Sequence, residues 1–192
     1  MANLPPESEI KSFPTPAKFR AWLEKNHGQS DGFWLRFFKK ASGEKTIIYA
    51  EAVEEALCHG WIDGQVKKYD ETSWIQRYTP RRPRSVWSKI NTGRAEQLIK
   101  EGRMTPSGLK QIEAAKADGR WASAYDSPST ATPPEDFLHE LAKNNKARAF
   151  FGTLSKSSIY SFIFRLQTAK KAETRKKRIK TFVEMLERGE KF

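Results

Sequence analysis

The chain has 192 residues, a single cysteine and a net charge of +12, with 35 lysines and arginines against 23 acidic residues. This length can bury a core of its own, as one domain or two small ones, and a lone cysteine excludes an internal disulfide. No apolar stretch approaches the roughly 20 residues of a membrane span, and the N-terminal sequence MANLPPESEIKSF lacks the basic and apolar parts of a secretory signal. We therefore expect a soluble, cytoplasmic, basic protein.

The first half of the chain alternates between helix and strand patterns. A helix is predicted over residues 16–26, where apolar residues recur at i, i+3 and i+4 before His27-Gly28. A strand is predicted over residues 32–40, and its two apolar faces indicate a central position in a sheet. A second helix is predicted over residues 49–58, with Glu55 outside its apolar stripe.

Two further strands, at 61–68 and 72–78, flank the turn-prone Tyr69-Asp70-Glu71 and predict a hairpin. Together with the strand at 32–40, this hairpin gives a small antiparallel sheet packed with helices. The fold class is therefore α+β for the N-terminal part, followed by a C-terminal helical region.

The rest of the chain is predicted to be helical. Helices are expected at about 88–101, 106–118, 134–143, 146–153, 156–168 and 172–188. The Ser, Thr and Pro residues of SPSTATPP, at 127–134, offer nothing to bury and indicate a linker. We therefore expect an α+β domain over 1–126, a linker over 127–134 and a helical C-terminal domain over 135–192.

The positive charge is concentrated in two parts of the chain. Residues 57–103 carry ten basic and five acidic side chains, and residues 145–192 carry thirteen basic and four acidic ones, whereas residues 1–56 are balanced. If folding brings the two basic parts together, they form a surface that attracts polyanions. Charge that serves solubility alone is the alternative that the sequence leaves open.

Cys58, His59 and Asp63 are the residues that a search for a nucleophile, a base and an acid selects. Adjacent side chains on a helix do not face each other, and a catalytic Cys-His pair normally joins residues distant in sequence. An enzyme using these three residues is therefore only a third hypothesis, and no catalytic residue is assigned. His27, His59 and His139 show none of the spacings of a zinc site, so we predict no metal and no cofactor.

The phrase TPRRPRSVWSK, at residues 79–89, predicts an anion site. Its two prolines restrict the residues before them to extended conformations, which stiffens the loop that holds three arginines. These arginines are Arg81, Arg82 and Arg84. Ser85 and Ser88 follow at the start of a helix, whose N–H groups attract anions, and Trp87 offers a stacking face. The alternative is a solvated loop whose serines cap the helix and whose tryptophan belongs to the core.

Arg175 is the unusual cation of the last predicted helix. It lies one turn before Ile179, on the same sector as Phe182, so its guanidinium must reach solvent, meet an internal carboxylate or line a site. Lys170 and Lys171 lie at the N-terminal side of this helix, where the helix dipole disfavours positive charge. Their placement indicates a ligand or an acidic partner.

Three phrases carry a family resemblance: ALCHGWIDGQ at 56–65, QRYTPRRPRSVWSK at 76–89 and AKKAETRKKRI at 169–179. In this order they resemble the YdeI/OmpD-associated family, a bacterial group of bacteriocin-protection proteins, and the likeness covers residues 12–190. His59 stands where an aromatic residue is expected in the first phrase. The resemblance implies a role in resistance to antimicrobial peptides or related stress, and it implies no reaction.

The motif positions that match the family are largely polar, which is unusual for positions that serve packing alone. Those predicted to bind ligand are Trp61, Asp63, Gln76, Arg77, Arg81, Arg82, Ser85, Trp87, Ser88, Lys170, Arg175 and Arg178. The remaining motif positions are Gly64, Pro80, Glu173 and Thr174.

These observations predict a stress-protection protein that binds a small anionic ligand, or an acidic partner, through a cationic and aromatic site. The site requires Arg175 to reach the neighbourhood of Asp63 and Arg81. Non-specific nucleic-acid binding through the same basic regions is the second hypothesis, although no recognised nucleic-acid motif is present. The oligomeric state is left open.

Overall fold

The computed structural model describes residues 4–192, whose contacts group the chain into two compact units. The first unit comprises the residues up to Ser85 together with Asn91–Gly119. The second comprises Val86–Ile90 together with Arg120–Phe192. The chain therefore contributes a short segment to the second unit before it completes the first.

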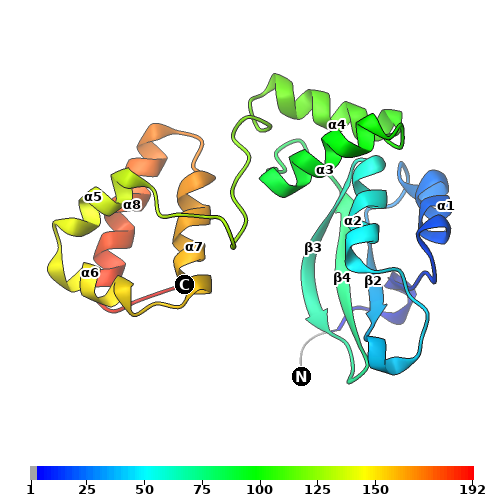
Figure 1. Ribbon diagram of the computed structural model, residues 1–192, viewed down its shortest axis with the longest axis horizontal. Coiled ribbons are helices and arrows are strands. Elements are labelled where there is room, and N and C mark those ends of the chain that lie inside the picture. Colours follow the sequence, from blue (N-terminus) through cyan, green and yellow to red (C-terminus); the bar gives the residue numbers. More distant parts are fainter. Residues whose placement is uncertain (1–3) are drawn as a thin grey trace. The chain divides into compact units, whose positions relative to one another are not determined.

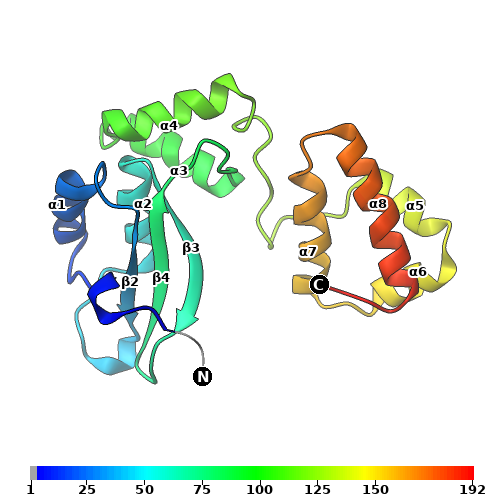
Figure 2. The same cartoon turned by 180° about the vertical axis from the view of Figure 1, so that it is seen from behind.

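Four strands form one mixed sheet in the first unit, in the order β1-β2-β4-β3. The central strands β2 (Phe33–Phe38) and β4 (Ser73–Pro80) are antiparallel, and β4 forms a hairpin with β3 (Trp61–Lys68). The two-residue strand β1 (Ile10–Lys11) joins the other side of β2 in parallel. Figures 1 and 2 show this sheet from opposite sides.

Helices α1 (Pro16–Asn26) and α2 (Tyr49–Cys58) cover one face of the sheet, and Figure 1 shows α2 in front of the strands. Thr15 caps α1 by accepting the N–H of Lys18 at 3.3 Å, and Pro16 occupies the first helical position, where its missing N–H costs nothing. The two helices and the sheet enclose an aromatic core. Its buried members are Phe19, Leu23, Phe33, Leu35, Phe37, Ile47, Ala52, Ala56, Trp61 and Tyr78.

Helix α4 (Pro106–Ala117) begins against the C-terminal end of α2. The carbonyl oxygen of Cys58 accepts bonds from both the backbone N–H of Thr105, at 3.1 Å, and its hydroxyl, at 2.6 Å. A Cβ at Gly108 would stand 2.4 Å from the same oxygen, so only glycine allows this approach. Helix α3 (Lys89–Lys100) precedes α4 in the chain.

The second unit is built on four helices: α5 (Glu135–Ala142), α6 (Asn145–Gly152), α7 (Lys156–Gln167) and α8 (Ala172–Glu187). Asn144 and Ser155 cap α6 and α7 through their side-chain oxygens. The apolar faces of the helices share one core. Its buried members are Phe137, Leu141, Ala147, Phe162, Leu166, Ile179, Phe182 and Leu186.

The α+β class and the helical C-terminal region are confirmed. The parallel strand β1, which makes the sheet mixed, was not predicted, because two residues carry no periodicity of their own. The short 3₁₀ turns Glu7–Glu9 and Lys40–Ser42 were also not predicted. The predicted domain limits, with a linker at 127–134, stay a prediction. Over the described part of the chain, no helix is both long and apolar enough to cross a membrane.

Candidate functional site

Asp63 and Gln76, two predicted site residues, meet on the helix-covered face of the sheet. Asp63 lies directly opposite Tyr78 in the β3–β4 pair, so both side chains point to the same face. The Oδ2 atom of Asp63 accepts the hydroxyl of Tyr49 at 2.9 Å and the Nε2–H of Gln76 at 2.7 Å. The fold therefore builds a polar cluster of Tyr49, Asp63, Gln76 and Tyr78 beside the aromatic core.

The two tyrosines of this cluster keep their protons at neutral pH. Burial raises the pKa of Tyr49 to about 12, and the charge of Asp63 acts in the same direction. Burial, with Asp63 again adding to it, also raises the pKa of Tyr78, whose hydroxyl is buried and has no hydrogen-bond partner among the described residues. The cluster thus places two neutral hydroxyls near one carboxylate, and that of Tyr49 donates to it.

Trp61 and Arg77 make structural contacts of their own. The indole of Trp61 is buried, and its N–H donates to the carbonyl oxygen of His27 at 3.2 Å. Arg77 lies on the opposite face of β4 from Gln76 and forms an ion pair with Glu9 at 3.5 Å. Trp61 therefore belongs to the core of the first unit.

The basic loop after β4 is a tight turn with two exposed arginines. Ser85 closes the turn twice, because its Oγ accepts the N–H of Arg82 at 2.9 Å and its own N–H donates to the carbonyl of Arg82 at 2.9 Å. Arg82 and Arg84 are exposed, whereas Arg81 is 5% exposed and donates its backbone N–H to Gly60. The turn presents two of its three guanidinium groups to solvent.

Trp87 and Ser88 belong to the second unit. The ring of Trp87 is buried with its centroid 4.9 Å from that of Trp121, and Ser88 bridges to Tyr125. The backbone of Tyr125 also bonds to the carbonyl of Trp87 and to the N–H of Lys89. The indole face of Trp87 is therefore part of a core contact.

The predicted arginines of α8 cap the end of α7. Arg175 grips Asp136 with two bonds of 2.7 Å and donates to the carbonyl of Leu166 at 2.8 Å, while Arg178 donates to the carbonyl of Arg165. These carbonyls belong to the last turn of α7, and that of Leu166 also accepts the N–H of Ala169 at 3.2 Å. The partner of Arg175 is thus a carboxylate, that of Asp136, which is exposed at the surface and not internal.

The predicted site residues lie in both units. Asp63, Gln76, Arg81, Arg82 and Ser85 are in the first, and Trp87, Ser88, Lys170, Arg175 and Arg178 are in the second. The convergence of Arg175 with Asp63 and Arg81 stays a prediction.

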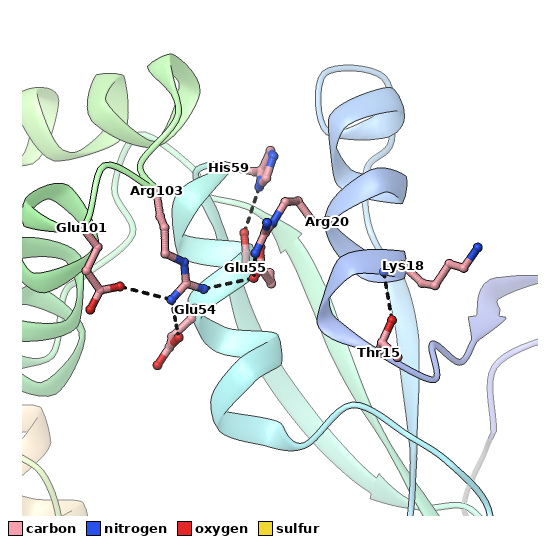
Figure 3. A network of polar contacts seen from close by, with 8 residues as sticks. All are labelled: Thr15, Lys18, Arg20, Glu54, Glu55, His59, Glu101 and Arg103. Carbon is pink, nitrogen blue, oxygen red and sulfur yellow. Dashed lines mark hydrogen bonds and ion pairs between the residues drawn. The ribbon is translucent and has the colours of Figure 1, made fainter.

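Glu55 is the centre of a charge network that the sequence did not predict. Its side chain is buried, contrary to its predicted position outside the apolar stripe, and Arg20 and Arg103 bind it at 2.7 and 3.0 Å (Figure 3). Burial alone would raise the pKa of Glu55, but the two arginines outweigh it, and the pKa is lowered. Arg103 also reaches Glu54 and Glu101.

Cys58, His59 and Asp63 do not share a hydrogen bond in the described residues. Burial raises the pKa of the Cys58 thiol to about 11, so the thiolate is scarce at neutral pH. His59 bonds to the carbonyl of Glu55, and Asp63 to Tyr49 and Gln76. Between residues 4 and 192, no group of three or more His, Cys, Asp or Glu side chains is arranged to hold a metal ion.

Two family models match the chain. Residues 11–111, just over half of the chain, match the model of a domain of unknown function, DUF8412. Residues 130–189 match the model described as bacteriocin-protection, YdeI or OmpD-associated. No curated protein and no solved structure matches the chain.

Proposed function

Because the chain belongs to the DUF8412 family and carries a bacteriocin-protection, YdeI or OmpD-associated domain at residues 130–189, we propose that it protects against bacteriocins or related stress by binding an anionic ligand. The ligand class is a small molecule that bears phosphate or carboxylate groups. Exposed lysines and arginines make the contacts.

The division of cations on α8 and in the two residues before it carries the proposal. Arg175 and Arg178 face inward and bond to protein groups, whereas Lys170, Lys171 and Lys177 are exposed and form no ion pair with any residue of the described chain. The second unit holds sixteen basic and eight acidic residues, a net charge of 16 − 8 = +8. Uncompensated lysines on such a unit attract an anion from solution.

Arg82 and Arg84 make a second set of available cations. Their turn is held by Ser85 at both ends, so little conformational freedom is lost when a phosphate or carboxylate binds. Trp87 is buried, which leaves charge and hydrogen bonding, not stacking, as the basis of recognition.

A cationic peptide is not the proposed ligand. The chain carries a net charge of +12, and like charge opposes the encounter with a cationic bacteriocin. Protection is therefore indirect, through an anionic cellular ligand.

Lysine substitutions test the proposal with a matched control. In K170Q/K171Q/K177Q, we expect affinity for tripolyphosphate or citrate to fall at least tenfold, or about 1.4 kcal/mol. The control K146Q/R148Q/K156Q removes the same charge from exposed positions elsewhere in the second unit, and its affinity should stay within about twofold of wild type. Isothermal titration calorimetry and thermal shift measure both.

Equal losses of affinity in the two triple variants would show that overall charge attracts the anion, and not Lys170, Lys171 and Lys177. That result would reject the proposed site. Binding of neither anion by the wild type would reject the ligand class. Nucleic acid is the second candidate, favoured by the net charge of +12. It requires tight binding of duplex or single-stranded DNA oligonucleotides, with an affinity that falls steeply as salt rises.

A further inference from the structure

Two histidines end neighbouring helices of the first unit in the same way. His27 caps α1 and His59 caps α2, and each Nδ1 lies 2.9 Å from the carbonyl oxygen four residues earlier, of Leu23 and of Glu55. A carbonyl oxygen only accepts, so each Nδ1 carries the hydrogen. In the neutral rings, both Nε2 atoms are therefore bare and able to donate a lone pair.

The two rings lie close together although 31 residues separate them in the chain. Their centroids are 5.6 Å apart and their planes are inclined by 59°. A zinc ion lies about 2.0–2.1 Å from an imidazole nitrogen, so two rings on one tetrahedral ion have centroids roughly 5 Å apart. The separation of His27 and His59 is close to that value.

His59 has an unsatisfied nitrogen. The residue is 4% exposed, and its Nε2 is buried without a hydrogen-bond partner in the part of the chain that the structure describes. Figure 3 shows one ring nitrogen turned toward Glu55 and the other turned away. Buried polar atoms normally have a partner, so this one calls for a ligand.

The surroundings allow a cation to enter and favour it. His27 is half-buried, which leaves a route from solvent, and Glu24 is exposed one helical turn before it. The charge of Arg20, the nearest arginine on α1, is taken up by the buried carboxylate of Glu55. Metal-binding histidines commonly donate the other ring N–H to a backbone carbonyl, as both rings do here.

We propose that His27 and His59 bind one divalent transition-metal ion through their Nε2 atoms, with water completing its coordination. Imidazole ligands suit Zn²⁺, Ni²⁺ and Cu²⁺, and the order of affinity among divalent metals places Cu²⁺ first. Two protein ligands make a site of modest affinity, since no third His, Cys, Asp or Glu in residues 4–192 is arranged to complete it. The sequence analysis predicted no metal, because it looked for spaced motifs. Helix packing brings these two histidines together and leaves no such motif in the sequence.

Titration of the metal-free full-length protein with CuCl₂, NiCl₂ and ZnCl₂ tests the site. We expect one ion per chain, with affinity that falls on acidification, because only a neutral imidazole binds the metal. H27A and H59F should each weaken binding more than tenfold. H139A removes an exposed histidine of α5 and should bind as the wild type does.

H59F and H27A differ in how far they are expected to disturb the fold. Phenylalanine at position 59 fills the buried volume but leaves the carbonyl of Glu55 without its donor, so circular dichroism must accompany the titration. Should H59F fail to fold, H27A decides the question, because His27 is half-buried. Wild-type affinity in H27A, loss of binding in H139A or no binding by the folded wild type would each overturn the proposal. Electron paramagnetic resonance of the Cu²⁺ form should report two nitrogen ligands.

Discussion

Arg175 and Lys177 stand two residues apart on α8 and have different surroundings. Arg175 bonds to Asp136 and to the carbonyl of Leu166, whereas Lys177 projects into solvent. The guanidinium thus joins a carboxylate to a carbonyl in the last turn of α7, and the added hydrogen bond makes this contact worth more than an exposed ion pair alone.

We expect R175A to lower the free energy of unfolding of the second unit by about 1–2 kcal/mol, because the Leu166 carbonyl loses one of its donors and Asp136 loses its ion-pair partner. K177A removes the same charge from the same helix and should change the free energy of unfolding by less than about 0.5 kcal/mol. Urea denaturation monitored by circular dichroism measures both. Equal effects of the two substitutions would contradict the structural role of Arg175.

Single residues mark the limit of what the sequence could predict. The position of Arg175 on the apolar sector left three alternatives, namely solvent, a carboxylate or a site. Its partner Asp136 lies 39 residues away, and only folding identifies it. Glu55 was predicted on the outer face of its helix and is buried. Periodicity describes one helix at a time, and Glu55 is compensated by arginines from α1 and from the segment after α3.

At the scale of elements, α2 and α4 meet through a glycine. Gly108 brings the first turn of α4 onto the Cys58 carbonyl, and Thr105 bonds to the same oxygen. Gly93, in the middle of α3, has no atom within 4 Å of the place where a Cβ would stand. A close contact between helices therefore requires glycine at position 108, whereas no contact requires it at position 93.

Alanine substitutions at these glycines should act in opposite directions. G108A forces apart two helices and should destabilise the first unit by about 1–3 kcal/mol. G93A raises the helix propensity without a clash and should stabilise the first unit by about 0.5–1 kcal/mol. Urea midpoints of the two variants against the wild type measure this. Stabilisation by G108A would mean that α4 does not dock on α2 as described.

Elements were predicted well where their signals are local. Thr15-Pro16 and Thr105-Pro106 set the starts of α1 and α4, and both helices begin at the predicted residue. The strand β1 has no such signal, since Ile10 and Lys11 become a strand only by pairing with β2. An element that forms only by pairing with a distant segment cannot be predicted from its local sequence pattern.

At the scale of the whole molecule, three carboxyl groups couple stability to pH. Hydrogen bonds and ion pairs lower the pKa values of Asp126, through Lys89 first, and of Asp136, through Arg175 first. The pKa of Glu55 is lowered by its arginines against the effect of burial. All three groups bind protons more weakly in the folded chain than in the unfolded one.

Acid should therefore unfold the protein. Because the unfolded chain takes up protons first, the stabilisation is complete above the unfolded pKa values, about 3.9 for Asp and 4.3 for Glu, and is lost as pH falls through the lower folded values. We expect the urea midpoint to fall slightly as pH drops below about 6.5, because burial lowers the pKa of His59 in the folded chain, and to fall more steeply between about pH 4.5 and 3. R175A should show a weaker acid dependence, since it removes the largest cause of the lowered pKa of Asp136. A midpoint that rises on acidification would contradict the assignment.

The segment Val86–Ile90 and the second unit that it packs in can change in evolution only together. It lies within the stretch matched by the first family model, yet Trp87 packs on Trp121 and the backbone pairs with Tyr125 in the second unit. Trp121 and Tyr125 lie between the two matched stretches, so the second unit begins before the second matched stretch and depends on a segment of the first. A C-terminal region transplanted from a relative would need its own version of Trp87 to come with it, so a change at Trp121 is tolerated only with a compensating change some 34 residues earlier.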